Sequence, residues 1–300
     1  MEFTRHEHSF ESRGVTCAGW LYRPEDVDEP PVVVMAHGFG GERTWGLPAF
    51  AERFAKRGLA VFLFDYRTFG ASDGEPRNLI DPFRHRADWL AAIEHVRSLS
   101  VVDGDSLALW GTSFSGGHVL EAAARIEGIS AVVAQVPFVD GPRTALKLVR
   151  HGGTQYLKRG FTAGVRDLAR AVVRRRPYYV PLVGSPDEFA ILNTPDTLRG
   201  VQTLIPDDEV WDNRCPARIV LTIMAYRPLT RAGDVDAPVF VAQAVEDTII
   251  PAATTNRLVR ELDDVERVRY PIGHFDAYVG KPFEALVDRE IEFLVRHLDD

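Results

Sequence analysis

The stretch from Leu107 to His118 constrains the fold of this chain more than any other, because it combines three local structures. It runs LALWGTSFSGGH and continues into VLEAAARI. The apolar start predicts a buried strand, and the helix formers after His118 predict an amphipathic helix. Between them, Gly111, Ser113 and Ser115 form a G-x-S-x-G-like turn in which serine takes the last small position. The chain is therefore expected to place Ser113 on a sharp strand-to-helix turn.

Such a turn has a chemical use. A serine hydroxyl is a weak nucleophile and must be presented to both a base and a substrate. The turn exposes Ser113 but crowds its neighbours, so small residues are needed at Gly111 and Ser115. The free N–H groups at the start of the next helix favour negative charge nearby. We expect Ser113 to be a nucleophile; the alternative is a glycine-rich turn whose serine has no special role.

Length, charge and cysteine content limit the class of protein. Three hundred residues suit one large domain or one domain with an insertion, and the formal charge of −8 argues against a general nucleic-acid binder. Cys17 and Cys215 lie far apart and are expected to be free thiols. The segment Met1–His8 lacks a signal-like apolar core, and no run is long enough to span a membrane. We expect a soluble cytoplasmic protein with neither a nucleic-acid nor a membrane partner.

The rest of the chain alternates apolar runs with amphipathic segments, which predicts an α/β fold with a mostly parallel, doubly wound sheet. Beyond the central stretch, strands are expected at Pro31–Ala36, Leu59–Phe64, Ile129–Gln135, Pro238–Ala244 and Glu266–Tyr270, preceded by two antiparallel strands within Glu2–Arg23. Helices are expected at Leu47–Arg57, Asp81–Ser98, Ala252–Leu262 and Pro282–Leu298.

This alternation stops between Asp140 and Asp212. The segment is helical in pattern but irregular, and it lacks strand signals, so we expect a helical cap (lid) insertion over 140–212. Residues 1–139 and 213–300 then form the core domain, with Asn213–Arg227 as a helix returning to the sheet. The run Arg174–Arg176 is expected to be a solvated face, although a role in binding an acidic substrate stays open.

A serine nucleophile needs a base, and the base needs an acid that orients it. In open α/β sheets, sites form beyond the carboxyl ends of the strands. Asp247 and His274 both directly follow a predicted strand, and the order Ser113, Asp247, His274 is the expected one. Asp140 remains an alternative acid, whereas Glu246 is expected to point to the other side of its turn.

Other histidines fit the role of base less well. His118 is too close to Ser113 in sequence, and His85, His95 and His297 lie within predicted helices, the first two facing solvent. His37 is expected to bind nearby backbone.

Two further expectations concern loop residues. Asp65 and Arg67 are expected to form an ion pair with each other. Asp276 is expected to accept hydrogen bonds from backbone N–H groups.

The loop His37–Gly41 ends a predicted strand. Its glycines let the backbone approach a ligand closely, and one of its main-chain N–H groups can supply half of an oxyanion hole.

Together these motifs resemble the α/β-hydrolase superfamily. They are HGFGG at 37–41, DYRTFG at 65–70, GTSFS at 111–115, DTIIP at 247–251 and GHFD at 273–276. Within the superfamily the chain is similar to capped bacterial and archaeal esterases grouped with dienelactone hydrolases and X-Pro dipeptidyl-peptidase-type hydrolases. Ser115 replaces the second elbow glycine, and Thr68 stands where relatives often have glycine. Neither departure removes a catalytic group.

The resemblance implies an α/β-hydrolase fold and a role for each site residue. Ser113 would be the nucleophile, His274 the general base and Asp247 its orienting acid. The main-chain N–H groups of Phe39 and Phe114 would form the oxyanion hole. No metal or organic cofactor is implied.

The predicted activity is hydrolysis of carboxylic esters, with a small to medium ester or related acyl compound as partner. A thioesterase, a C–C bond hydrolase or an acyltransferase with the same triad stays open, and a non-catalytic binding module is less favoured. The oligomeric state is not specified, and a homodimer remains open.

Overall fold

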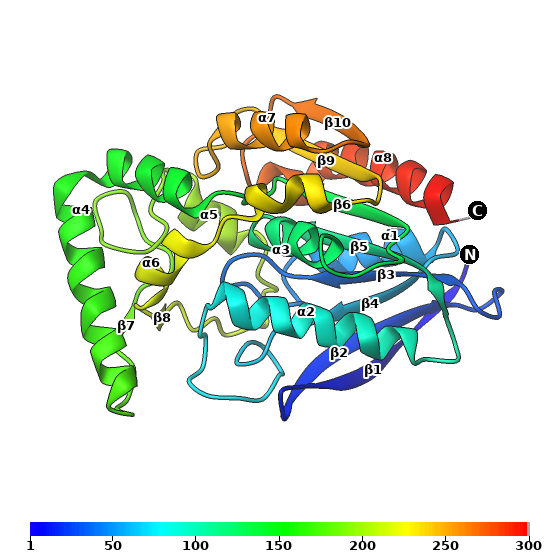
Figure 1. Ribbon diagram of the computed structural model, residues 1–300, viewed down its shortest axis with the longest axis horizontal. Coiled ribbons are helices and arrows are strands. Elements are labelled where there is room, and N and C mark those ends of the chain that lie inside the picture. Colours follow the sequence, from blue (N-terminus) through cyan, green and yellow to red (C-terminus); the bar gives the residue numbers. More distant parts are fainter. Residues whose placement is uncertain (299–300) are drawn as a thin grey trace.

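A computed structural model describes residues 1–298 and has an eight-stranded sheet at its centre, in the order β1-β2-β4-β3-β5-β6-β9-β10 (Figure 1). The strands are β1 (Phe3–Ser12), β2 (Val15–Pro24), β3 (Pro31–Ala36), β4 (Ala60–Phe64), β5 (Asp103–Thr112), β6 (Ala131–Gln135), β9 (Val239–Ala244) and β10 (Val265–Tyr270). β2 runs antiparallel to both β1 and β4, and the six strands β4-β3-β5-β6-β9-β10 run parallel to one another. The predicted mostly parallel α/β sheet is confirmed.

Helices cover both faces of this sheet. On one side lie α2 (Pro82–Arg97), α3 (Phe114–Ala123) and α7 (Ala252–Glu261), and on the other lie α1 (Leu47–Ala55) and α8 (Gly280–Leu298). β3 shows why both faces need cover: Val32 and Val34 pack into the first layer, whereas Val33 and Met35 pack into the second. Each fully buried aliphatic side chain contributes about 1.5–3 kcal/mol of transfer free energy.

Residues 136–238 add no strand to the large sheet. They comprise α4 (Gly141–Val172), α5 (Thr197–Gln202), α6 (Ile219–Thr222), the short 3₁₀ helices η1 (Ile223–Ala225) and η2 (Pro228–Asp234), and the two-stranded pair β7 (Tyr179–Val180) and β8 (Cys215–Pro216). The part from α4 to η1 lies beyond the carboxyl ends of the large sheet, at the left of Figure 1, whereas η2 returns beside α3 and α7. α4 bends at Gly153, where φ is 72°, so it consists of two arms. We use the word cap for the segment Asp140–Asp212.

The structure differs from two expectations in this region. The cap does contain a strand, β7, and Asn213–Arg227 is not one helix but starts with β8 before the short α6. The Asn213 side chain holds this start extended, because its amide binds both the N–H and the C=O of Val183, at 2.9 and 2.8 Å. Pro216 also disfavours a helix here, because it lacks the backbone N–H that an α-helical hydrogen bond requires. The division into a core of 1–139 and 213–300 and a cap of 140–212 stays a prediction.

Among the helices of residues 1–298, none combines the length and the apolar character that a membrane crossing requires.

Candidate active site

Ser113 lies on the turn between β5 and α3, in a conformation that few residues adopt. Its φ is 55° and its ψ is −117°. The turn is fixed by two backbone bonds of 2.8 Å, from the N–H of Ser113 to the carbonyl of Gln135 and from the N–H of Phe138 to the carbonyl of Ser113. A Cβ at Gly111 would overlap the carbonyl of Ser115, which explains the small residue there. Strain of this kind persists only where the surroundings over-determine it.

Ser115, which replaces the second elbow glycine, has a partner of its own. Its Oγ lies 3.0 Å from the hydroxyl of Tyr66, which accepts a hydrogen bond of 2.9 Å from the indole of Trp89. All three side chains are buried. The departure from the usual glycine therefore extends a buried polar network under the turn.

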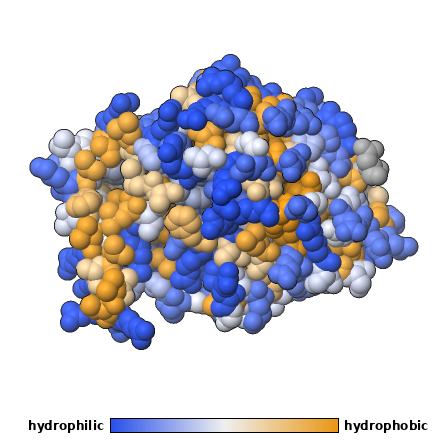
Figure 2. Space-filling model, in the orientation of Figure 1, coloured by the Kyte–Doolittle hydropathy of each residue, from blue (hydrophilic) through white to orange (hydrophobic). Residues whose placement is uncertain are grey.

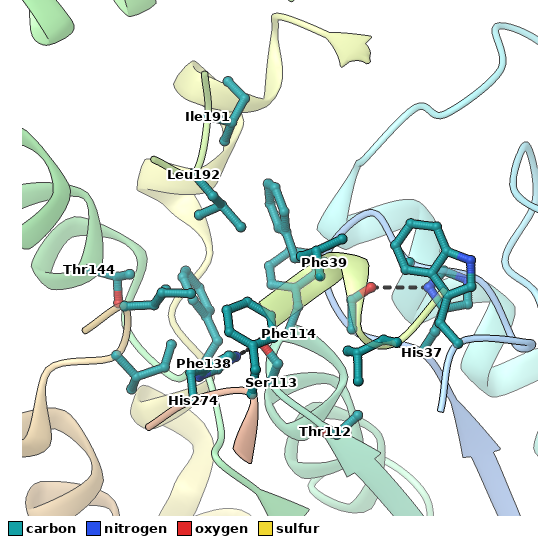
Figure 3. A pocket seen from close by; sticks show the side chains of 18 of the residues that line it. His37, Phe39, Thr112, Ser113, Phe114, Phe138, Thr144, Ile191, Leu192 and His274 are labelled. Atoms are coloured by element: carbon teal, nitrogen blue, oxygen red, sulfur yellow. Dashed lines mark hydrogen bonds between the residues drawn. The ribbon is translucent and has the colours of Figure 1, made fainter. Parts of the chain in front are cut away.

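The three residues expected to act together do lie together. His274 Nε2 is 3.0 Å from Ser113 Oγ, and His274 Nδ1 is 2.6 Å from Asp247 Oδ2. The His274 and Asp247 side chains are only 3% and 5% exposed. Figure 3 shows His274 beside Ser113 at the base of a cavity.

The surroundings of Asp247 keep it ionised. Burial alone would raise its pKa, but the charge of His274 and the hydrogen bond to it, together with the N–H groups of Ile250 and Ile249, outweigh burial and lower the pKa. Both N–H groups bind Asp247 Oδ1 at 2.7 Å. An ionised Asp247 favours the tautomer of His274 with the proton on Nδ1, which leaves Nε2 free to accept the proton of Ser113.

Lys147 on the first arm of α4 reaches the loop that carries Asp247. Its Nζ donates to the carbonyls of Asp247 at 2.7 Å and of Ile250 at 3.1 Å. The cap thus holds the backbone of the acid loop directly. Sequence reasoning missed this contact, because no local pattern links residues a hundred positions apart.

The glycine loop after β3 lies against Ser113. A Cβ at Gly38 would be 3.2 Å from the Cβ of Ser113, so a larger residue there would press on the turn. The rings of Phe39 and Phe114 meet edge to face, with centroids 5.2 Å apart. Within residues 1–298, neither of these two residues' amides donates a hydrogen bond, so both are available to a ligand.

The predicted ion pair between Asp65 and Arg67 is wrong. Asp65 binds Arg43 instead, accepting from its N–H at 2.7 Å and lying 3.3 Å from its guanidinium. Arg67 pairs with the buried Asp88 on α2. Both partners come from elements distant in sequence, so proximity along the chain misled the expectation.

His37 behaves as expected. Its Nδ1 lies 3.0 Å from the carbonyl of Gly38, and burial lowers the pKa of the ring to about 3, so it is neutral.

His85 and His95 do not face solvent, contrary to expectation. His85 is 1% exposed and stacks on Tyr66 with ring centroids 4.1 Å apart. His95 is half-buried and stacks on Phe10 at 5.9 Å. His85 shares a stripe of α2 with Trp89, which is buried against the sheet, whereas the ring of His95 is covered by Phe10 and His8 of β1.

His118 and His297 have other partners than Ser113. His118 binds the hydroxyl of Tyr226 through Nδ1 at 2.6 Å, and His297 lies against Phe293 near the end of α8.

Asp140 does not contact His274. Its side chain caps α4 by accepting from the N–H of Arg143 at 3.0 Å, and it lies 3.2 Å from Arg227. Glu246 is exposed. Asp276 accepts a bond of 2.8 Å from the N–H of Gly273, as expected. Of the carboxylates considered as the acid, the structure brings Asp247 to His274.

Ser113 and His274 open into an apolar cavity of about 140 Å³ between the core loops and the cap. In Figure 3, Ile191 and Leu192 of the cap lie across this cavity from the two side chains. Other apolar lining residues include Phe39, Trp45, Phe138, Leu148, Val201, Leu204, Ile219, Ile223, Ile250 and Phe275.

The cavity wall also holds a carboxyl group that sequence reasoning missed. Burial, followed by the charges of Asp65 and Glu209, raises the pKa of Glu42 to about 8. Glu42 follows the glycine loop directly, which is the one local signal that could have indicated it. Glu209 also binds Trp45 Nε1 at 2.8 Å and Thr44 Oγ1 at 2.7 Å.

In the described part of the chain, no three His, Cys, Asp or Glu side chains converge as metal ligands.

Comparison with known proteins gives a consistent result. A family model described as serine aminopeptidase, S33, matches residues 29–274. The quorum-quenching protein AidA of Acinetobacter baumannii (strain MDR-ZJ06) is 39% identical over 295 residues, covering 96% of this chain and 93% of that protein. The polyketide transferase af380 of Aspergillus fumigatus is 26% identical, with 95% and 96% covered.

Among solved structures, the α/β hydrolase GrgF from Penicillium sp. sh18 superposes with a TM-score of 0.81 at 24% identity, covering 99% of this chain and all of that one. At that identity the likeness concerns the fold.

Proposed function

The chain belongs to the serine aminopeptidase S33 family of α/β hydrolases, and on that premise we propose that it hydrolyses carboxylic esters of apolar substrates through an acyl-enzyme. One observation carries the proposal: the hydrogen-bonded series Ser113, His274, Asp247 opens into an apolar cavity. The chain is an enzyme of the α/β-hydrolase class, and the proposal concerns which bond it cleaves and in which substrate.

In the proposed reaction, Ser113 Oγ attacks the ester carbonyl carbon while its proton passes to His274 Nε2. The carbonyl oxygen becomes an oxyanion that the N–H groups of Phe39 and Phe114 bind. When the intermediate collapses, the C–O bond to the alcohol breaks and His274 returns the proton to the departing oxygen. An acyl group is then left on Ser113.

Water completes the cycle. It gives a proton to His274 Nε2 and attacks the acyl carbon, forming a second oxyanion at the same two N–H groups. Collapse breaks the bond to Ser113 Oγ, which regains its proton from His274, and the carboxylic acid leaves. Asp247 stays ionised and stabilises the charged imidazolium throughout.

The side chains that line the cavity favour an ester as substrate over a peptide with a free amino terminus. A free α-ammonium group next to the scissile bond needs a carboxylate to bind it. Among the described cavity residues the acidic side chain is Glu42, and its raised pKa of about 8 keeps it mostly protonated at neutral pH. An apolar acyl or alkyl group suits the surrounding side chains better.

A second candidate is acyl transfer, in which an alcohol or thiol replaces water as the acceptor. It is favoured by the polyketide transferase name of a full-length relative and by the exclusion of water that an apolar, cap-covered cavity provides.

The quorum-quenching name of the 39% identical relative makes a bacterial signal molecule a candidate substrate.

The proposal is tested with a p-nitrophenyl ester series from acetate to decanoate, using the parent and Ser113→Ala. We expect turnover by the parent and a loss of at least about a thousandfold in the variant, because no other group replaces the nucleophile. Phosphonate labelling of Ser113 without turnover of these esters would point instead to thioesters, lactones or acyl transfer. A thioester, a lactone and an acyl acceptor would then be compared using the same acyl group. No labelling and no turnover would reject the proposal.

A further inference from the structure

The second arm of α4, which ends at Val172, exposes large apolar side chains along one side. Between 45% and 77% of each remains accessible for Leu157, Phe161, Val165, Leu168 and Val172. Their spacing of three or four residues places them on one helix face. Figure 2 shows apolar side chains gathered in a band over α4. We call these five residues the α4 stripe.

The stripe does not face its own chain. A different side of the same arm packs against the rest of the chain, since Gly160, Ala163 and Gly164 are buried. Asp167, also on that side, binds Arg218 and the N–H of Tyr178. An exposed apolar band of this length usually marks a binding surface.

The stripe is nearly symmetric about its centre. Leu157 and Val172 lie at almost equal distances on either side of Val165, and so do Phe161 and Leu168. An antiparallel second copy would therefore place Leu157 against Val172, Phe161 against Leu168 and Val165 against itself. Such self-complementarity is what a two-fold interface needs.

Charge supports the same arrangement. The exposed run Arg174–Arg176 directly follows the arm, so in an antiparallel pair it comes beside the start of the other copy's arm. There Tyr156 packs on Phe189 with ring centroids 5.7 Å apart, next to the exposed acidic residues Asp187 and Glu188. In that pairing the arginines of one copy come near Asp187 and Glu188 of the other, which offset the exposed Lys158 and Arg159 at the same end of the arm.

We propose that this chain forms a two-fold symmetric homodimer in which the α4 stripes of two copies pack antiparallel. A stripe of this length spans roughly 24 Å at about 1.5 Å per residue. One helix pair is a small interface, so the dimer should dissociate on dilution. A lipid surface would also cover apolar side chains, but it requires neither the symmetric spacing nor the acidic loop.

Sedimentation velocity over a wide range of micromolar concentrations tests the proposal. We expect the parent to dimerise and Val165→Lys to remain monomeric, because two ammonium groups would meet at the symmetry axis. Thr162→Lys is the matched control: it adds the same charge to an exposed position of the same arm but off the stripe, and it should dimerise. Circular dichroism and ester turnover should stay unchanged. A parent that is monomeric throughout, or a Val165→Lys variant that dimerises normally, overturns the proposal.

Cysteine cross-linking gives a second test that does not depend on Val165→Lys folding. Val165→Cys should form an intermolecular disulfide on oxidation, whereas Thr162→Cys should not. The native Cys17 and Cys215 are buried and should stay silent. A monomeric parent that co-sediments with phosphatidylserine vesicles would instead identify the stripe as a lipid-binding surface, and equal cross-linking of both variants would also reject the dimer.

Discussion

At the scale of single residues, Asp247 decides which nitrogen of His274 carries a proton. Asp247→Asn preserves an oxygen for the N–H groups of Ile249 and Ile250, but its amide would donate toward His274 Nδ1. The proton of the imidazole would then move to Nε2, which could no longer accept from Ser113. We predict a fall in kcat of roughly a thousandfold or more.

Ester hydrolysis by Asp247→Asn and by Asp140→Asn separates the two candidate acids. Asp140→Asn should retain kcat within about tenfold, because Asp140 caps α4 and does not touch His274. If the two variants lost activity in the opposite order, Asp247 would not be the orienting acid.

Glu290 on α8 provides a prediction about stability. Its side chain is fully buried, Oε2 accepts from Trp110 Nε1 at 2.9 Å, and Oε1 has no partner in the described residues. Burial raises its pKa from 4.5 to about 8. The stability it contributes is therefore fully present below about pH 4.5 and is lost as pH rises through about 8.

Glu290→Gln removes this titration without changing the shape of the side chain. We predict that the variant loses less stability than the parent between about pH 5 and 8, by up to roughly 1.4 kcal/mol per pH unit. Urea unfolding of both proteins across that range measures the difference. Parallel stability curves would show that Glu290 is ionised in the native state.

The site residues divide into those that sequence can reveal and those that it cannot. Ser113, Asp247 and His274 were identified because each directly follows a strand, so the fold itself brings them to one edge of the sheet. Their catalytic roles remain proposals. Lys147, Glu42 and the partners of Asp65 depend on contacts between distant elements, which no local pattern encodes.

At the scale of elements, most strands buried on both faces were predictable to within a residue or two, because continuous apolar runs such as Pro31–Ala36 have few alternative structures. β5 is the exception, since it begins at Asp103, four residues before the expected Leu107. The region after β6 was not. β7 and β8 have two residues each, and their pairing depends on Asn213 binding Val183. The positions of His85 and His95 were misjudged because their rings pack on aromatic side chains of distant elements, Tyr66 and Phe10, which the local pattern of α2 does not show.

The link between α4 and the acid loop gives a prediction at this scale. Lys147→Met keeps the packing of the chain's methylene groups but removes both bonds to the backbone carbonyls of Asp247 and Ile250. Because the loop positions Asp247 relative to His274, we expect kcat to fall by roughly tenfold to a hundredfold, which corresponds to the loss of one charged hydrogen bond.

Steady-state kinetics with one p-nitrophenyl ester tests this link. Arg150→Met, an exposed position on the same arm of α4, should behave like the parent. Lys147→Arg should restore part of the rate, since a guanidinium can also donate to carbonyls. A Lys147→Met variant that matches Arg150→Met would mean that the acid loop holds its position without α4.

At the scale of the whole molecule, two sets of buried groups oppose each other as pH changes. Burial lowers the pKa of His37 and His118 to about 3 and that of His85 well below 6.5. These histidines contribute stability that is present above about pH 6.5 and lost as pH falls toward 3. The carboxyls of Glu42 and Glu290 act in the opposite sense, because burial raises both pKa values to about 8.

Between about pH 4.5 and 6.5 the two carboxyls offset only part of the effect of the three histidines, so we expect stability from these groups to be maximal near pH 6.5, with a decline on both sides. His85→Phe tests the acid side: a phenyl ring can keep the stack on Tyr66, and neither His85 nitrogen has a well-formed hydrogen bond to a described residue. Because the variant has one buried histidine fewer that resists protonation, its free energy of unfolding should fall less steeply with decreasing pH, by about 1.4 kcal/mol per pH unit. The decline on the alkaline side should not change. His6→Phe, at an exposed position, should have the parent's profile. An acid decline that is as steep in His85→Phe as in the parent would show that His85 is not among the groups that cause it.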